Sequence, residues 1–410
     1  MSSNPLQVFY VLRQRHIRLL WLGQLLSAFG DRFFEIAVVW LSVQIIGSEA
    51  GFVLAAGSIA RLICGLLGGV YADRWDRQKV MIAVDILRTL TILSLPLAAL
   101  IGEITLVQLA IVAAIEAGLS GFFDPALQAS LPTLADNTQT LQASNALLDV
   151  TSRMARIFAP GLAGLLTTFV PLEHFFSIDA VTFAVSAVAL FAIGRDFAWR
   201  PEQDVAAKRG LRAIFDDVWS AMQLVRQNRA VFWSLLSYVP ANVAWSAIFM
   251  VGLALLADEV LNEGVQGFSF LITGYGIGSV LSNIVVGGMQ VKNRPRFLFA
   301  GVVIFGLGLL LLGLTSSFTL ALGCMFIASL GTPMSDLLIV LMIQEEFPAN
   351  QVGKVYSLRL TISSLGFSAG LLLAAPLFQW VSISLGILLL GLLVVVVGVA
   401  GVVRFYGTAV

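Results

Sequence analysis

The chain has 410 residues, of which 58% are hydrophobic and only 12% are charged. A soluble globular protein carries about 25% charged residues, so this composition excludes an ordinary water-soluble domain and requires lipid as a large part of the solvent. Basic and acidic residues balance at 24 each, so no overall charge favours binding of nucleic acid.

Twelve apolar stretches are long enough to cross a bilayer as helices, which takes about 20 residues each. They lie near 19–45, 52–71, 80–101, 104–125, 146–170, 174–194, 233–256, 266–288, 297–316, 318–342, 355–378 and 382–404. The residues before the first stretch are polar and basic, and that stretch is too long for the core of a cleavable signal. It is therefore predicted to be the first membrane span.

Basic residues occur on one side of the predicted membrane. They lie in the N-terminal tail and at 74–79, 195–229, 292–296, Lys354 and Arg404. Connections on the other side, near 46–51, 102–104, 171–175, 257–266, 315–318 and 379–384, contain no Lys or Arg. Basic loops stay in the cytoplasm, so we expect a multi-pass protein of the plasma (inner) membrane with both termini cytoplasmic.

The long connection 195–232 divides the chain into a six-helix bundle at 1–194 and another at 233–410. Leu25-Leu26-Ser27 matches Leu235-Leu236-Ser237, and Gly68-Gly69 matches Gly287-Gly288, in the same order. These matches indicate a duplication. The predicted fold class is an all-α membrane protein with twelve transmembrane helices in two pseudo-symmetric six-helix bundles.

The second part of the connection, from Leu211, carries apolar residues on one helical face, among them Val218, Trp219 and Val225. This pattern predicts an amphipathic helix in the cytoplasmic linker 195–232. It is typical of a helix that lies in the membrane interface and equally of a soluble linker helix packed on the bundle.

Charged side chains inside predicted spans are the first candidates for function, because burying a charge in a membrane is costly. Asp31 and Glu35 are four residues apart on one face of the first span, Arg32 lies between them, and Glu116 lies within the fourth. A carboxylate removed from water can exchange a proton near neutral pH, which predicts a proton-coupling or substrate site. The alternative is structural: an ion pair between Arg32 and one of the acids that fixes helix register.

Asn242, Trp245 and Phe249 share one face of the seventh span, and Tyr275 lies in the eighth. Aromatic surfaces suit bulky apolar or amphipathic ligands, so these four residues are predicted to line a substrate cavity. Ordinary packing or lipid-facing surface gives the same pattern.

The loop after the second span reads Gly69-Val-Tyr-Ala-Asp73-Arg74-Trp75-Asp76-Arg77-Gln78-Lys79. It resembles the signature loop of the major facilitator superfamily, G-x-x-x-D-R-x-G-R-[KR], with Asp76 in place of the usual glycine. Other stretches resemble its drug:proton antiporter branch, which contains macrolide-efflux and enterobactin-export proteins. These stretches are Gly23-Gln24-Leu-Leu-Ser27-Ala-Phe-Gly30-Asp31, Asp85-Ile-Leu-Arg88 and Arg156-Ile-Phe-Ala-Pro160-Gly161-Leu-Ala-Gly164.

The resemblance implies an exporter that works by alternating access, with a cytoplasmic latch between the signature loop and the start of the eleventh span. We assign to this latch Gly69, Asp73, Arg74, Arg77, Lys79, Asp85, Arg88, Arg153, Lys354 and Arg359. Pro160, Gly161 and Gly164 resemble the antiporter motif of the fifth span. Close packing of a helix by small residues explains them equally well.

The sequence therefore predicts proton-coupled export of an amphipathic small molecule, drug-like or siderophore-like. The alternative on the same fold is a lipid or lysolipid flippase or facilitator without a proton step. An enzyme or a membrane sensor is disfavoured, because no nucleophile–base pair, metal-ligand set, phosphate-binding loop or appended soluble domain is evident. We expect no cofactor, no metal and no nucleic acid, and a monomer whose partners are its substrate, protons and the lipid bilayer.

Overall fold

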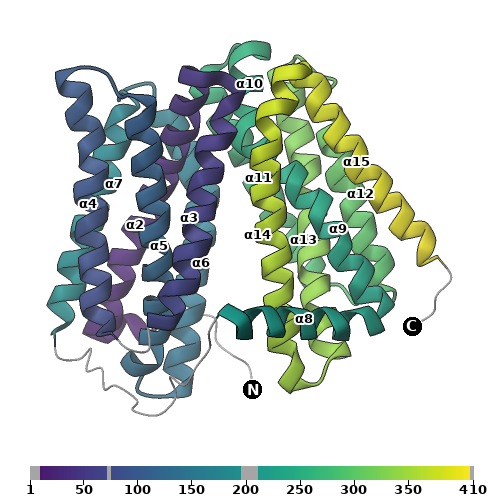
Figure 1. Cartoon of the computed structure of the whole chain (residues 1–410), viewed down its shortest axis with the longest axis horizontal. Coiled ribbons are helices and arrows are strands. Elements are labelled where there is room, and N and C mark those ends of the chain that lie inside the picture. The colour runs from purple at the N-terminus through teal and green to yellow at the C-terminus, as the bar shows by residue number, and fades with distance from the viewer. Residues whose placement is uncertain (1–9, 72–74, 195–210, 407–410) are drawn as a thin grey trace. The chain divides into compact units, whose positions relative to one another are not determined.

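The computed structural model describes residues 10–71, 75–194 and 211–406, and within them the chain forms helices and no strand. It divides into two compact units. Unit 1 comprises Met1–Ile45 and Ala56–Lys208, and unit 2 comprises Ile46–Ala55 and Arg209–Val410. The predicted all-α fold is confirmed (Figure 1).

The first half of the chain supplies six long helices. They are α2 (Arg15–Ile46), α3 (Ala50–Tyr71), α4 (Arg77–Ile101), α5 (Leu106–Leu134), α6 (Thr138–Leu166) and α7 (Glu173–Ile193), with short 3₁₀ turns at Val11–Arg13 and Gly47–Glu49. Several helices extend beyond the predicted apolar stretches because polar residues cap them. α6 begins at Thr138 and not near 146, since the Asn137 side chain accepts a hydrogen bond from the Thr140 backbone N–H at 2.8 Å.

The second half begins with α8 (Leu211–Gln227) and continues with six spans. The seventh is continuous over Arg229–Val260 and consists of α9 (Arg229–Ala247), a π-helical segment (Ile248–Gly252), α10 (Leu253–Leu255) and a second π-helical segment (Leu256–Val260). The others are α11 (Gly264–Gly287), α12 (Arg294–Leu312), α13 (Phe318–Glu346), α14 (Ala349–Trp380) and α15 (Ile383–Arg404). Together with α2 to α7 they make the twelve predicted crossings.

Most of these helices are long and apolar enough to cross a membrane. Ten helical stretches are long and apolar enough to cross a membrane, and the first of them, Arg15–Gly65, contains α2 and most of α3. α6 is not among the ten, because the part up to Arg156 is polar and carries Asp149, Arg153 and Arg156. The chain is a multi-pass membrane protein.

The amphipathic helix predicted from Leu211 is α8. It lies across one end of the unit 2 helices in Figure 1 and contacts α14. Ala221 and Val225 are buried on the contacting side, whereas the Trp219 ring is 60% exposed. The helix therefore packs on the bundle and leaves the Trp219 ring exposed, which fits both interpretations.

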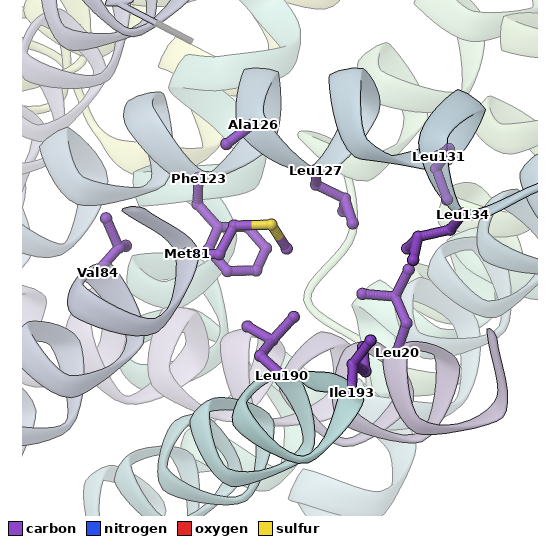
Figure 2. Packing of buried hydrophobic residues seen from close by; sticks show 10 residues of the cluster. All are labelled: Leu20, Met81, Val84, Phe123, Ala126, Leu127, Leu131, Leu134, Leu190 and Ile193. Atoms are coloured by element: carbon purple, nitrogen blue, oxygen red, sulfur yellow. The ribbon is translucent and has the colours of Figure 1, made fainter. Parts of the chain in front are cut away.

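Unit 1 is held together by an apolar core at one end of α2, α4, α5 and α7 (Figure 2). The core residues are Leu20, Met81, Val84, Phe123, Ala126, Leu127, Leu131, Leu134, Leu190 and Ile193. In a lipid environment such interior contacts gain mainly from close packing. Packing in this core sets which faces of α4, α5 and α7 turn toward one another farther along the helices. The buried charged residues described below lie on those faces.

Glycines let the helices of unit 2 approach one another closely, most clearly between α12 and α13. A Cβ atom added at Gly308 would come within 2.6 Å of the Ala328 Cα. We expect Gly308→Leu to force the two helices apart and to destabilise the fold by about 1–3 kcal/mol or more. Thermal unfolding of the purified protein, followed by size-exclusion chromatography, measures the loss.

Gly323 of α13 provides the matched control, because a Cβ added there meets nothing within 4 Å. Gly323→Leu should unfold at the wild-type temperature. Equal loss of stability in both variants would show that added bulk, and not the α12–α13 contact, is responsible.

Candidate functional site

Arg88 of α4 is the buried cation at the centre of unit 1. Its side chain is 5% exposed, and its Nη2 lies 3.4 Å from Oε1 of Glu116 on α5. The guanidinium stacks over the rings of Phe123 and Phe183, at 5.4 and 4.7 Å from their centroids. Phe123 belongs to the core of Figure 2, so the core directly supports the charge. An arginine held in this way is a fixed counterion for the acids around it.

Asp179 of α7 is fully buried beside α2. A Cβ added at Gly30 of α2 would collide with Oδ1 of Asp179 and with the Thr182 hydroxyl, which shows how closely the two helices approach there. The Thr182 hydroxyl donates to the Asp179 backbone carbonyl at 2.8 Å. Oδ2 of Asp179 is buried without a hydrogen-bond partner, and an unsatisfied buried oxygen of this kind calls for an explanation.

Asp31, Asp85, Glu116 and Asp179 form what we call the carboxylate cluster. The carboxylate of Asp179 interacts electrostatically with Asp31, Glu116 and Arg88. The carboxylate of Asp85 interacts in the same way with Arg88 and Asp31. Asp85 is fully buried, and it lies near Ser186 of α7. Four acids from four helices thus lie within range of the charge of one buried arginine, which contacts Glu116 directly.

Two of the predicted coupling residues, Asp31 and Glu116, are brought together in this cluster. Glu35 is not part of it: it forms an ion pair with Arg32 on the same helix, three residues away. This pair joins two partly exposed residues of one helix, so it does not set the register between helices, and the role of Glu35 stays a prediction. The exposed pair of Arg61 and Asp124, at 2.7 Å, flanks the cluster.

The aromatic cluster of unit 2 contains three of the four residues predicted to line a cavity. Trp245 and Phe249 stack with centroids 4.8 Å apart, and Tyr275 meets Phe249 edge-on at 4.5 Å. Phe367 of α14 adds a fourth ring, 5.8 Å from Trp245. Asn242 lies one turn earlier on α9, and its amide donates to the Tyr238 backbone carbonyl at 2.8 Å. The first π-helical segment contains Phe249, and such segments often occur at functional sites.

The residues assigned to a latch are dispersed. Arg77 donates to the Ala129 carbonyl of α5 at 2.6 Å, and Lys79 lies 3.5 Å from Asp76. Asp76, which replaces the family glycine, caps α4 by accepting from the Lys79 backbone N–H at 3.2 Å. Asp73 and Arg74 lie outside the described residues, and Gly69 falls near the end of α3.

Asp85 and Arg88, also predicted at the latch, belong instead to the carboxylate cluster, because their face of α4 turns toward α5 and α7. Arg359 contacts Asp336 of α13. Arg153 pairs with Asp149 at 2.7 Å, and Lys354 is exposed.

The motif in the fifth span lies within continuous helix. α6 runs through Pro160, which is buried, and Gly164 is buried as well, with Gly161 half-buried between them. Thr167 donates to the Gly164 carbonyl at 2.7 Å. These contacts fit both interpretations of the motif, a bend with a functional role and close packing by small residues.

A family model for the Major Facilitator Superfamily matches residues 20–262 and 236–409, almost the whole chain. The chain belongs to the major facilitator superfamily. Among superfamily relatives, macrolide efflux protein A of Streptococcus pyogenes is 23% identical, over 93% of each chain. The multidrug efflux pump Tap of Mycolicibacterium fortuitum is 24% identical, over 92% of this chain and 94% of its own. A solved POT family transporter in complex with 5-aminolevulinic acid has a TM-score of 0.75 at 12% identity, covering 96% of each chain.

The superfamily membership makes the chain a transporter, and the whole-length matches confirm the family inferred from the signature loop. Asp179 is a fully buried acid that is missing from the candidates named from the sequence. α7 begins at Glu173, so Asp179 lies almost two turns inside it. The available signal was the apolar sequence on both sides of Asp179, which leaves no water to solvate a carboxylate.

Proposed function

We propose that this transporter exports amphipathic small molecules, drug-like or siderophore-like, in exchange for protons by alternating access. The observation that carries the proposal is the carboxylate cluster, in which Asp31, Asp85, Glu116 and Asp179 lie within range of the charge of the buried Arg88. Efflux proteins among the relatives support the outward direction. We place the protein in the plasma (inner) membrane, as a monomer with cytoplasmic termini.

The cluster suggests how a proton changes the balance of charges. Arg88 lies 3.4 Å from Glu116, while Asp31 and Asp179 are close enough for their charges to interact. A proton on Glu116 weakens its attraction for Arg88 and frees the guanidinium to pair with another acid of the cluster. Because these acids come from α2, α4, α5 and α7, a change of partner alters the contacts among four helices of unit 1.

The test uses purified protein in proteoliposomes with an imposed pH gradient and a pH-sensitive dye inside. A panel of amphipathic drugs, siderophores and lysolipids is added in turn. We expect dye changes that depend on a drug or siderophore and vanish when a protonophore collapses the gradient. Substrate movement without proton movement would refute the coupling and favour the facilitator or flippase.

We retain the signature loop as a latch in this proposal and expect Asp73→Asn to slow turnover severalfold while leaving substrate binding nearly unchanged. Removing the charge weakens the pairing predicted with the basic residues of the same loop. Transport rates in proteoliposomes and equilibrium binding in detergent measure the two effects separately. Unchanged turnover would refute the latch.

A further inference from the structure

Two exposed arginines at one end of unit 2 are stacked on aromatic rings. The guanidinium of Arg404, the last residue of α15, lies 4.3 Å from the centroid of the Trp233 ring on α9. The guanidinium of Arg296, in the first turn of α12, lies 4.4 Å from the centroid of the Tyr406 ring. Such stacking holds a cation in place without neutralising it.

These two arginines have no acidic partner among the described residues. Arg294, two residues before Arg296, does have one, because it forms an ion pair with Glu345 of α13. A guanidinium whose flat face covers a ring keeps its N–H groups available around the edge. Arg296 and Arg404 can therefore donate several hydrogen bonds to an anion from outside the chain.

The end of α15 is attached to the start of α12, and this attachment holds the two arginines in place. Phe405 follows Arg404 in the chain, and its ring stacks on that of Phe299 with centroids 5.8 Å apart. The side-chain amide of Asn293 donates to the Phe405 carbonyl at 3.2 Å. The two cations are thus positioned by the fold before any ligand binds, which lowers the entropy cost of binding.

An apolar stripe on α15 leads to this end. α15 is the most apolar of the ten membrane-spanning stretches. Val396, Val399 and Val403 lie on one of its faces and are 57%, 46% and 68% exposed. Exposed apolar side chains on a membrane-spanning helix face the acyl chains of lipids. The stripe ends beside Arg404, so an acyl chain that lies along it would bring its headgroup to the arginines.

Aromatic side chains place this end of unit 2 at the level of the lipid headgroups, where Trp and Tyr are enriched. Trp233 and Tyr406 lie there. α8 ends at Gln227, directly before α9 begins, so its exposed Trp219 ring lies at the same end (Figure 1). The basic connection 292–296 makes this the cytoplasmic end in the proposed topology, and the cytoplasmic leaflet contains anionic lipids.

We propose that the ends of α9, α12 and α15 form a binding site for the headgroup of an anionic phospholipid. Arg296 and Arg404 donate to the phosphate oxygens, and the valine stripe packs against an acyl chain. Phosphatidylcholine also carries a phosphate, but the two guanidiniums repel its ammonium group. The site therefore selects lipids with a net negative charge. This binding does not depend on which molecule is transported or on proton coupling.

The experiment titrates the delipidated full-length protein in detergent with dioleoylphosphatidylglycerol or dioleoylphosphatidylcholine, which share the same acyl chains. Native mass spectrometry counts the lipids bound to each protein molecule. We expect the wild type to bind its first phosphatidylglycerol about tenfold more tightly than its first phosphatidylcholine, a factor typical of one charge-assisted contact. The double variant Arg296→Gln with Arg404→Gln should lose most of this preference.

The double variant Arg13→Gln with Arg15→Gln is the matched control. It removes two exposed arginines from unit 1, and Arg13 also stacks on a ring, 4.6 Å from the centroid of Tyr10. Because the change in net charge is the same, this variant should keep the preference for phosphatidylglycerol. An equal loss in both double variants would show that overall charge attracts the lipid, and it would overturn the proposed site.

Thermal unfolding provides a second measurement. Without lipid, the wild type and the variant of Arg296 and Arg404 should unfold at the same temperature, because both side chains are exposed. Phosphatidylglycerol should raise the unfolding temperature of the wild type more than that of the variant, since a ligand stabilises the state that binds it.

Inorganic phosphate separates a lipid site from a site for free anions. Millimolar phosphate should leave the first phosphatidylglycerol bound, because it lacks the acyl chains that contact α15. Displacement of the lipid by phosphate would contradict the proposal, and so would equal binding of the two lipids by the wild type.

Discussion

Replacing Arg88 by methionine should destabilise the protein by about 3–5 kcal/mol, the range measured when one partner of a buried ion pair is removed. Arg88 is 5% exposed and Glu116 is 16% exposed, so neither charge has water to replace the other. Methionine keeps the aliphatic part of the side chain but not the guanidinium that lies over Phe123 and Phe183. The loss therefore reports the guanidinium with its ion pair and its ring contacts, and thermal unfolding in detergent measures it.

The double variant Arg88→Met with Glu116→Gln separates this charge effect from packing. Glu116→Gln removes the carboxylate that Arg88→Met leaves unpaired, together with its repulsion of Asp31 and Asp179, so the double variant should recover a large share of the lost stability. A change in stability that differs from the sum of the two single changes is typical of two groups in contact. A double variant that is less stable than Arg88→Met would show that Glu116 stabilises the fold independently of Arg88.

Replacing Asp31 by asparagine should reduce substrate-dependent proton movement to the level of empty liposomes while downhill substrate movement continues. Asp31 lies within range of the charges of the carboxylate cluster and is half-buried, so its carboxylate is partly accessible. The amide has nearly the same shape but cannot gain or lose a proton in this range. Lumenal pH and substrate uptake are recorded in the same proteoliposomes.

Asp149→Asn is the comparison, because that carboxylate is exposed on α6 and paired with Arg153. It should retain coupled proton movement. If Asp31→Asn also retains it, with substrate moving both up and down its gradient, then Asp31 is not the coupling residue.

The number and order of the spans followed directly from the sequence, because a bilayer demands a long apolar stretch for every crossing. Residues on a single helix were also predicted well. Trp245 and Phe249 do stack, since a spacing of four residues places two rings on one face. The pairing of Arg32 with Glu35 was anticipated as an alternative for the same reason.

Contacts between helices could not be predicted from the sequence. Periodicity shows which residues share a face of a helix, but it does not show which other helix that face contacts. Nothing in the sequence pairs Gly30 with Asp179, or Asp336 with Arg359. Asp85 and Arg88 were accordingly assigned to the cytoplasmic latch, although their face of α4 turns inward. The charged cluster becomes visible only when four helices are assembled.

The π-helical segments in the seventh span also affect how the two halves of the chain can be compared. Hydrogen bonds to the fifth residue along give a wider turn that holds more residues than an α-helical turn. A segment such as Ile248–Gly252 is therefore a place where a helix has accommodated an inserted residue without losing its direction. In evolutionary terms, the match of Leu25-Leu26-Ser27 with Leu235-Leu236-Ser237 pairs Asp31 with Ala241, six residues after the first leucine of each match. The π-helical segment follows Ala241, so a residue inserted there leaves that correspondence unchanged.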